Sequence, residues 1–323
     1  MPYKVLVSAS DVVDLDVIRE ELAAVDAEVT VIDAHTEAEV REAVADADAL
    51  LVDSTTPVTA AVLDDASDLR VVGRCGIGVD NVAVEAAADR DVVVTNVPDY
   101  CVDEVTTHAL SLALACVRNL SAYDASVRAG EWDWAAGRPL RRLRGRTLGL
   151  AAFGKIPRRL SRKIAGFGMT VAAYDPYVDA EEMAEYGVEK VDFETLLAES
   201  DVLSVHVPLT EETRGLFDAE AFAAMREDAV FVNTSRGPVV DTDALAAALA
   251  DGELARAGVD VMPEEPPDAS PLFDRDDVIL SPHVAWYSEE AREELSRRVA
   301  ADAAAVLAGK DPRTPVDPQD PFV

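Results

Sequence analysis

The chain has 323 residues, 49% of them hydrophobic, which is enough for two domains of ordinary size, each with its own core. With 62 acidic against 29 basic residues, its net charge of −33 excludes binding to nucleic acid or anionic membranes by bulk electrostatics. No apolar run approaches the ~20 residues of a membrane span, and the N-terminus resembles a strand more than a signal peptide. We therefore expect a cytoplasmic protein.

The acidic residues are spread over predicted helical faces, as in Asp179-Ala-Glu-Glu-Met-Ala-Glu185, and do not form blocks. Their mutual repulsion destabilises a compact state at low salt. At ~1 M salt the screening length falls to about 3 Å, so this repulsion nearly vanishes. The charge therefore predicts a halophilic protein adapted to a molar-salt cytoplasm, with an ordinary acidic protein as the alternative.

Cysteine and histidine are both sparse. Three cysteines without a CxxC pair, Cys75, Cys101 and Cys116, suit a reducing compartment and argue against a disulfide framework. The four histidines show no metal-ligand spacing, so we expect no metal site.

The first hundred residues alternate between short, β-branched apolar runs and helical stretches. The predicted strands are Lys4–Val7, Glu28–Ile32, Ala49–Val52, Val71–Arg74 and Val92–Thr95. The helical stretches include Asp14–Ala24 and Glu37–Ala45, and a long Ala- and Leu-rich helix follows over Val102–Leu120. This rhythm predicts a parallel, doubly wound sheet.

A second series of the same kind follows the long helix. Its predicted strands are Thr147–Ala152, Thr170–Tyr174, Val188–Lys190, Asp201–His206, Ala229–Asn233, Ala255–Asp260 and Val278–Leu280. A final helix is expected over Glu289–Leu307 and an irregular tail over Asp311–Val323. The fold class is therefore α/β, with two doubly wound parallel sheets.

A loop with the features of a phosphate-binding turn follows the first strand of the second series. In Gly149-Leu-Ala-Ala-Phe-Gly-Lys-Ile-Pro157, the three glycine positions of a GxGxxG fingerprint fall on Ala152, Gly154 and Pro157. Only the middle glycine, which lets the backbone approach a pyrophosphate, is present. Proline is well tolerated in a first helical turn.

Asp175 follows Gly154 by 21 residues, at the end of the next predicted strand. An acid at this position accepts hydrogen bonds from the adenosine ribose and repels a 2′-phosphate, which favours NAD over NADP. Charged hydrogen bonds of this kind contribute about 1.5 to 3 kcal/mol. NADP(H) remains a second choice because Arg158 and Arg159 lie near the loop. The alternative for Asp175 is a helix N-cap or turn residue.

One arginine, one glutamate and one histidine each follow an apolar run near the end of the second series. Arg236 has the planar fork of donors that suits a carboxylate. His283 can deliver a proton to a carbonyl oxygen as hydride arrives. Glu265 can pair with it, favouring the protonated imidazole and fixing its orientation, although the adjacent Glu264 competes for this role.

Several longer motifs together resemble the D-isomer-specific 2-hydroxyacid dehydrogenases, which include phosphoglycerate, glyoxylate, formate and D-lactate dehydrogenases and the C-terminal-binding corepressors. They are Gly73-Arg-Cys-Gly-Ile-Gly-Val-Asp-Asn-Val82, Asn96-Val-Pro98, Tyr174-Asp-Pro176, Asn233-Thr-Ser-Arg-Gly237, Gly258-Val-Asp-Val261 with Glu265, and Pro282-His283. The ending Pro282-His-Val-Ala-Trp-Tyr-Ser288 is similar to that of the corepressor branch. The chain departs from the family at Ala152, Pro157, Thr107 and Ala109.

The resemblance implies a domain organisation and an assembly. A flavodoxin-like substrate domain would comprise residues 1–98 and 288–323, and a Rossmann-like NAD-binding domain residues 99–287. A homodimer would form through the long helix near Val102–Leu120.

The resemblance also implies roles for individual residues. Arg236, Glu265 and His283 would be catalytic, with Glu265 placed five residues beyond Asp260 as the family pattern requires. Backbone N–H groups of Ile77, Gly78 and Val79 would bind the substrate carboxylate, and Tyr100 and Trp286 would wall its pocket. Besides Gly154 and Asp175, the cofactor would contact Lys155, Ile156, His206, Val207, Pro208, Thr213, Thr234, Ser235 and, at the nicotinamide amide, Asp260.

We therefore expect an NAD(H)-dependent enzyme that reversibly reduces 2-keto acids to D-2-hydroxy acids. Two alternatives stay open: an NAD(H)-sensing, corepressor-like binding protein with weak activity, and a short phosphoglycerate dehydrogenase. Corepressors keep the same Arg, Glu and His, so these residues do not exclude a sensor.

Overall fold

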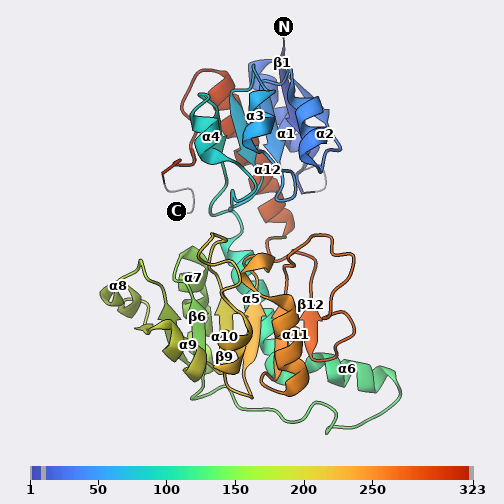
Figure 1. Cartoon of the computed structure of the whole chain (residues 1–323), viewed down its shortest axis with the longest axis vertical. Helices are drawn as coiled ribbons and strands as arrows, with labels where there is room; N and C mark the ends of the chain where they lie inside the picture. Colours follow the sequence, from blue (N-terminus) through green and yellow to red (C-terminus); the bar gives the residue numbers. More distant parts are fainter. Residues whose placement is uncertain (1, 9–11, 320–323) are drawn as a thin grey trace. The chain divides into compact units, whose positions relative to one another are not determined.

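The computed structural model describes residues 2–8 and 12–319, which divide into two compact units (Figure 1). Unit 1 comprises residues 1–100 and 287–323, and unit 2 comprises residues 101–286. The chain thus leaves unit 1 once, builds the whole of unit 2 and returns. The sequence placed these boundaries at 98/99 and 287/288.

Unit 1 contains a five-stranded parallel sheet in the order β2-β1-β3-β4-β5. Its elements are β1 (Tyr3–Val7), α1 (Leu15–Leu22), β2 (Ala27–Val31), α2 (Glu37–Val44), β3 (Ala49–Val52), α3 (Ala60–Asp64), β4 (Val71–Arg74), α4 (Val84–Ala88), β5 (Val93–Thr95) and α12 (Glu289–Leu307). Strands β3 and β4 are buried along their whole length, as expected for the middle of a sheet covered on both faces.

Unit 2 contains a seven-stranded parallel sheet in the order β12-β11-β10-β9-β6-β7-β8. Its strands are β6 (Thr147–Ala151), β7 (Thr170–Tyr174), β8 (Glu189–Lys190), β9 (Val202–Val205), β10 (Val230–Asn233), β11 (Arg256–Val259) and β12 (Val278–Leu280). Its helices are α5 (Val102–Arg118), α6 (Leu120–Arg128), α7 (Lys155–Ile164), α8 (Ala180–Ala184), α9 (Phe193–Glu199), α10 (Ala219–Ala223) and α11 (Thr242–Asp251).

Two apolar clusters cover the two faces of the second sheet. One joins α5, α7 and α8 to the strands, and the other joins α9, α10 and α11 to them (Figure 1). Close packing requires glycine on the first face, since a Cβ at Gly258 of β11 would lie 2.9 Å from Leu112 of α5. The two parallel sheets predicted from the sequence are confirmed.

The predicted long helix ends earlier than expected. Helix α5 ends at Arg118, because Asn119 adopts a left-handed backbone with φ of 47° and its amide donates to the carbonyl of Gly137. Asparagine tolerates this conformation better than most residues. Helix α6 then begins at Leu120.

The tail expected to be irregular is described as far as residue 319, and residues 320–323 lie outside the described part. Pro315 pairs with Thr95 at the end of β5 in an isolated antiparallel bridge. Among the described residues, no helix combines the length and apolar character needed to cross a bilayer.

Candidate active site

The predicted site residues of unit 2 share one edge of its sheet. In the order of the strands along the sheet, Asp175 follows β7, Gly154 follows β6, His206 follows β9, Thr234 follows β10, Asp260 follows β11 and His283 follows β12. Because all the strands are parallel, these positions lie at their common carboxyl edge. The strand order reverses direction between β6 and β9, and doubly wound sheets bind dinucleotides at such a point.

The amino end of helix α7 offers unpaired donors at this reversal point. Within the described residues, the backbone N–H groups of Gly154, Lys155 and Ile156 have no acceptor in the protein, and Pro157 has no N–H to satisfy. A Cβ built on Gly154 would meet no protein atom within 4 Å, so packing does not require glycine there. These donors, at the positive end of a ten-residue helix, fit a phosphate group.

Ala152 stands where the fingerprint has its first glycine, and its backbone has a φ of 81°. This left-handed region favours glycine, and a Cβ there costs about 1–2 kcal/mol. The chain therefore adopts a left-handed backbone at this position of the fingerprint without the glycine that adopts it at little cost.

Asp175 is anchored against the same turn. Its two carboxylate oxygens accept hydrogen bonds from the backbone N–H groups of Phe153 and Tyr177, each at 2.8 Å, and its exposed fraction is 9%. Arg158 donates to Glu182 at 2.6 Å, and Arg159 donates to Asp103 at 2.7 Å. Both arginines near the loop are therefore paired with carboxylates of the protein itself.

The residues predicted to border the adenosine follow β9. His206 hydrogen-bonds Ser204 at 2.9 Å, and burial lowers the pKa of His206 to about 3, so the imidazole is neutral at physiological pH. Thr213 donates to the carbonyl of Pro208 at 2.6 Å and closes the loop between them. Val207, just before this loop, is buried in the core cluster beside α9, α10 and α11.

The loop after β10 holds Arg236 in a braced conformation. The side chain of Asn233 accepts from the backbone N–H of Ser235 at 3.0 Å and donates to the carbonyl of Arg236 at 3.0 Å. A Cβ at Gly237 would lie 1.9 Å from the backbone of Met262, so only glycine fits there. The hydroxyl of Thr234 is buried and has no partner among the described residues.

Glu265 and His283 form a close pair. The imidazole Nδ1 lies 2.6 Å from Glu265 Oε2, and Oε1 accepts from the backbone N–H of Met262 at 2.8 Å. Burial acts to raise the pKa of Glu265, but the hydrogen bond and charge of His283, the Met262 N–H and the charge of Arg236 outweigh it and lower the pKa below its usual value. Of the two adjacent glutamates, Glu265 is the one that contacts the imidazole, whereas Glu264 is exposed.

Asp260 organises the loop that carries His283. Its carboxylate, 0% exposed, accepts from the Ser281 hydroxyl and from the backbone N–H groups of Val284 and Ala285. Sequence reasoning missed His108 and Ser281, which hydrogen-bond each other at 2.9 Å beside this carboxylate. Their only signals were position, one within the long helix and one two residues before His283. The nicotinamide contact expected of Asp260 remains a prediction.

In unit 1, the loop after β4 carries the predicted carboxylate-binding residues. The N–H groups of Ile77, Gly78 and Val79 have no acceptor in the protein among residues 2–8 and 12–319, and the carbonyl of Ile77 accepts from Asn96 at 2.6 Å. Successive unpaired N–H groups of this kind form an anion-binding nest. Tyr100, the last residue before unit 2, is 8% exposed, and Trp286 closes unit 2 as a half-buried residue.

Comparison with known proteins identifies the family. Residues 110–285 match the sequence model of the "D-isomer specific 2-hydroxyacid dehydrogenase, NAD binding domain". The D-3-phosphoglycerate dehydrogenase of Mycobacterium leprae is 41% identical over 283 residues, which cover 88% of this chain and 53% of that protein. The glyoxylate reductase of Thermococcus litoralis is 40% identical over 277 residues, covering 84% of each chain.

A solved structure agrees with these sequence matches. The D-lactate dehydrogenase of Aquifex aeolicus, crystallised with NAD and lactic acid, superposes with a TM-score of 0.86 at 26% identity, covering 95% of this chain and 96% of that one. The chain spans about half the length of the phosphoglycerate dehydrogenases it matches. With its parallel sheets and matched NAD-binding domain, the chain belongs to the D-isomer-specific 2-hydroxyacid dehydrogenases.

Proposed function

We propose that the chain is an NAD(H)-dependent enzyme that reversibly reduces 2-keto acids to D-2-hydroxy acids. The observation that carries this proposal is the His283–Glu265 pair at 2.6 Å, with the charge of Arg236 acting on the same glutamate. This pair lies at the same carboxyl edge of the sheet as the unpaired N–H groups at the start of α7. A proton donor, a cation and a dinucleotide cradle are the parts that such a reduction requires.

In the proposed reaction, His283 is the acid in reduction and the base in oxidation. Its Nδ1 donates to Glu265, so Nε2 is the nitrogen that gives or takes the proton. The ionised Glu265 favours the imidazolium and holds the ring in one orientation. Bound NADH supplies the hydride.

The substrate carboxylate is bound in this proposal by Arg236 and by the N–H groups of Ile77, Gly78 and Val79. The guanidinium offers paired donors to a planar anion. We propose Tyr100 and Trp286 as walls of the substrate pocket. We also propose that residues 1–98 and 288–323 form the substrate domain.

The surroundings of the loop favour NAD(H) over NADP(H). Asp175 stands at the end of β7, where it would accept hydrogen bonds from ribose hydroxyls, and its charge opposes a 2′-phosphate. The two arginines that would favour a phosphate are already paired with Glu182 and Asp103. Three buried, free cysteines suit a reducing cytoplasm, where we place the enzyme.

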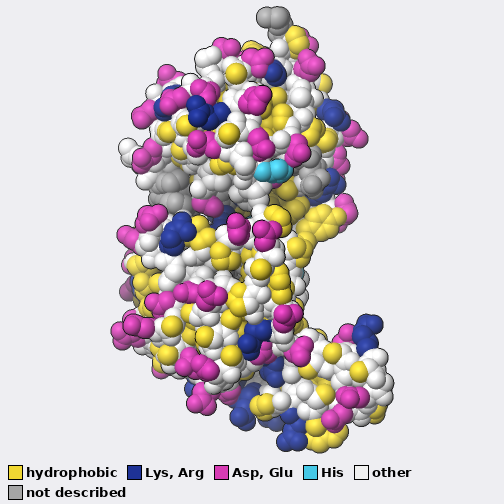
Figure 2. Space-filling model, turned by 45° about the vertical axis from the view of Figure 1, so that its right-hand side comes forward, with side chains coloured by type: hydrophobic (Ala, Val, Ile, Leu, Met, Phe, Trp, Pro, Cys, Tyr) yellow, Lys and Arg dark blue, Asp and Glu magenta, His cyan; other side chains and the backbone are white. Residues whose placement is uncertain are grey.

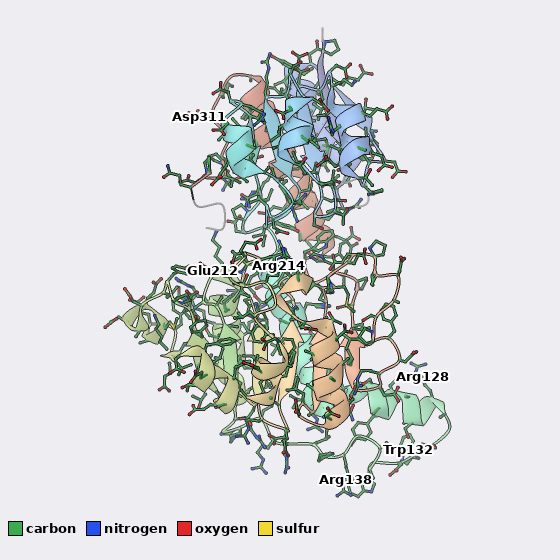
Figure 3. The ribbon with its side chains drawn as sticks, in the orientation of Figure 1. Arg128, Trp132, Arg138, Glu212, Arg214 and Asp311 are labelled. Carbon is green, nitrogen blue, oxygen red and sulfur yellow. The ribbon has the colours of Figure 1, made fainter. Side chains whose placement is uncertain are left out.

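A homodimer is the proposed assembly. Residues 118–146 carry seven arginines and three acidic residues, so this segment is basic within an acidic chain. Trp132 is 91% exposed and Trp134 75% exposed, and Figure 3 shows Arg128, Trp132 and Arg138 at one end of unit 2, on α6 and the segment after it. Figure 2 shows Lys and Arg gathered at this end of a surface that is otherwise rich in acid.

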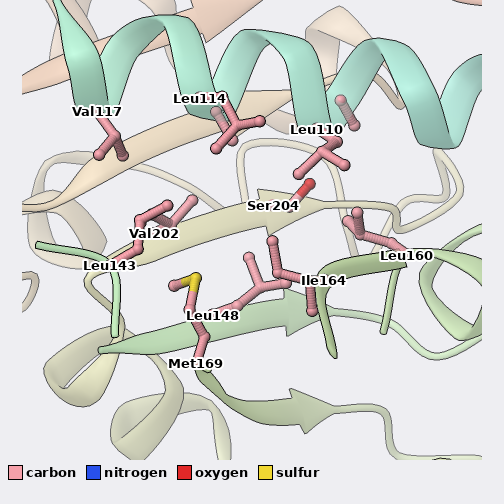
Figure 4. A pocket seen from close by; sticks show the side chains of 12 residues that line it. Leu110, Leu114, Val117, Leu143, Leu148, Leu160, Ile164, Met169, Val202 and Ser204 are labelled. Atoms are coloured by element: carbon pink, nitrogen blue, oxygen red, sulfur yellow. The ribbon is translucent and has the colours of Figure 1, made fainter. Parts of the chain in front are cut away.

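The predicted dimer helix α5 borders an apolar hollow within the same unit. It lies beside α5 and is lined by its Leu110, Leu114 and Val117, together with Met169 and, as its polar member, Ser204 (Figure 4). We expect replacement of both Trp132 and Trp134 by Ser to yield monomers in light scattering at molar KCl. Tyr177→Ser, at an aromatic residue 85% exposed, is the matched control and should leave the dimer intact.

The test of the enzymatic proposal is NADH and NADPH oxidation at molar KCl with glyoxylate, pyruvate, and branched, aromatic and phosphorylated 2-keto acids. The matched variant is His283→Asn, because His283 has a φ of 51° and Asn tolerates that backbone better than Ala. We expect turnover above ~1 per second with at least one acid, and a loss of at least 100-fold in the variant.

Each other outcome has a defined meaning. Turnover that survives in His283→Asn would contradict the assigned acid. No turnover with any acid, combined with tight NADH binding, would replace the enzyme with an NAD(H)-sensing binding protein. Turnover confined to the phosphorylated acid would identify a phosphoglycerate dehydrogenase.

A further inference from the structure

The loop that carries His283 is fixed to one buried carboxylate. Asp260 Oδ1 accepts from the Ser281 hydroxyl at 2.6 Å and from Val284 N at 3.0 Å, and Oδ2 accepts from Ala285 N at 2.9 Å. The backbone carbonyl of Asp260 accepts from His283 N at 2.7 Å. These bonds bracket His283 on both sides and hold it in its left-handed conformation, with φ of 51°.

A side chain from helix α5 completes this arrangement. His108 Nε2 lies 2.9 Å from the Ser281 hydroxyl oxygen and 3.5 Å from Asp260 Oδ1. A serine hydroxyl has one hydrogen, and the Ser281 hydroxyl donates it in the hydrogen bond to the Asp260 carboxylate. The bond between His108 and Ser281 must therefore use the N–H at Nε2 as donor, which gives a directed chain from His108 through Ser281 to Asp260.

Besides its three hydrogen-bond donors, the buried carboxylate of Asp260 has one basic neighbour in the described part of the chain. Among the residues that the structure describes, His108 is the only basic side chain within ion-pair distance of Asp260. A buried carboxylate keeps its geometry through the donors that surround it. Losing the outermost donor therefore weakens the next bond in the chain, and the loop bonds depend on that carboxylate.

We propose that His108 is a positioning residue for His283, acting through Ser281 and Asp260. It touches neither substrate nor cofactor in this scheme, and its donor holds the 281–285 loop so that His283 Nδ1 stays on Glu265. This inference rests on the proposed function of His283 as the acid. Ser281 is the second positioning residue of the same chain.

The substitutions separate the donor from the bulk of the side chain. His108→Gln keeps an N–H donor at a similar reach, and His108→Leu removes it while keeping an apolar side chain of moderate size. Ser281→Ala deletes one oxygen atom, and Ser281→Thr keeps the hydroxyl. Ser111→Ala is the control on the same helix, since that exposed hydroxyl bonds only its own helix backbone.

With a keto acid that the parent enzyme reduces, we expect His108→Leu and Ser281→Ala each to lower kcat about tenfold, with KM changed less than threefold. His108→Gln and Ser281→Thr should restore kcat to within about threefold of the parent. The double variant His108→Leu with Ser281→Ala should be no worse than Ser281→Ala alone, because both break one chain. Ser111→Ala should match the parent.

A second readout does not depend on turnover. The chain has four histidines, so imidazole ¹H–¹⁵N spectra can be assigned from single variants. We expect the slowly exchanging Nδ1–H signal of His283 to shift or broaden in His108→Leu and Ser281→Ala, and to persist in His108→Gln. An unchanged signal and unchanged kcat in His108→Leu would overturn the proposal, as would equal losses in the Gln and Leu variants. An inactive parent whose His283 signal responds as expected would instead contradict only the proposed reaction.

Discussion

At the residue scale, the site depends on how a few side chains divide their hydrogen bonds. One carboxylate oxygen of Glu265 accepts a hydrogen bond from the Met262 backbone, and the other contacts His283. The first bond fixes the carboxylate, and its charge then stabilises the imidazolium. Glu264, one residue earlier, is exposed. Of these two adjacent acids only Glu265 contacts the imidazole, and substitution of each can test that difference.

Replacing Glu265 by Gln should move the alkaline limb of the pH–rate profile for keto-acid reduction to lower pH. The reason is that the imidazolium loses the anion that favours it. The lowered pKa of Glu265 keeps it ionised at neutral pH; its contribution to stability is present above about pH 4.5 and is lost as pH falls through the folded-state pKa. The variant should therefore be less stable than the parent at pH 7 and equal to it in strong acid.

The matched control is Glu264→Gln, which removes the same charge one residue away. It should leave both the pH–rate profile and the denaturation midpoint unchanged. An identical shift in the two variants would mean that net charge near the site, and not the contact with Nδ1, sets the profile.

At the scale of the element, the start of α7 has features that the packing of the protein itself does not explain. Its three N–H groups have no acceptor in the protein, and its glycine is not required by packing. A segment of this kind is explained by what it binds. Ligand affinity and stability should therefore separate when it is altered.

Gly154→Ala should raise the Kd for NADH at least tenfold while changing Tm by no more than about 2 °C. The new Cβ meets no protein atom within 4 Å, so it strains nothing in the fold, but it points into the space where a pyrophosphate would approach. Titration by fluorescence and thermal unfolding measure the two quantities. Gly166→Ala, also with nothing within 4 Å, is the control, and a similar loss of affinity there would remove the argument.

Element bounds followed from the sequence wherever periodicity and turn chemistry were local. Helix α12 lies over Glu289–Leu307 as predicted, because Ser288 caps its first turn by accepting from Ala291 N. Helix α5 was predicted two residues too long, since Leu120 continues the apolar pattern while Asn119 breaks it through a contact with distant Gly137. Ala152 shows the same limit, because its left-handed backbone is imposed by its neighbours and leaves no trace in its residue type.

Site residues could be proposed from the sequence where side-chain chemistry is rare and not where it is common. Arg236, Glu265 and His283 could be named because few residue types perform those tasks. Ser281 and His108 could not, because their roles depend on a contact across 173 residues of chain. Distances of this kind are set by the sheet order, which the sequence pattern does not give.

At the scale of the whole molecule, the charge of −33 is the dominant property. Figure 2 shows acidic side chains over the visible surfaces of both units. Between ~0.1 M and ~2 M KCl we expect Tm to rise by at least several degrees, because screening removes self-repulsion. Replacing exposed Glu20, Glu42, Glu181 and Glu185 by Lys should flatten that dependence. A Tm independent of salt in the parent would contradict the prediction of a halophilic protein.

The path of the chain through the two units bears on how the protein is made. Asp14 N donates to the Ser296 hydroxyl at 2.8 Å, and α1 packs against α12, so unit 1 joins residues 282 positions apart. All of unit 2 lies within residues 101–286 and precedes α12 in synthesis. During translation, unit 2 can therefore finish folding while the first hundred residues still lack their last helix. The apolar surface that α12 will cover on α1 and β4 is exposed throughout that interval, which makes it the natural site for a chaperone on the nascent chain.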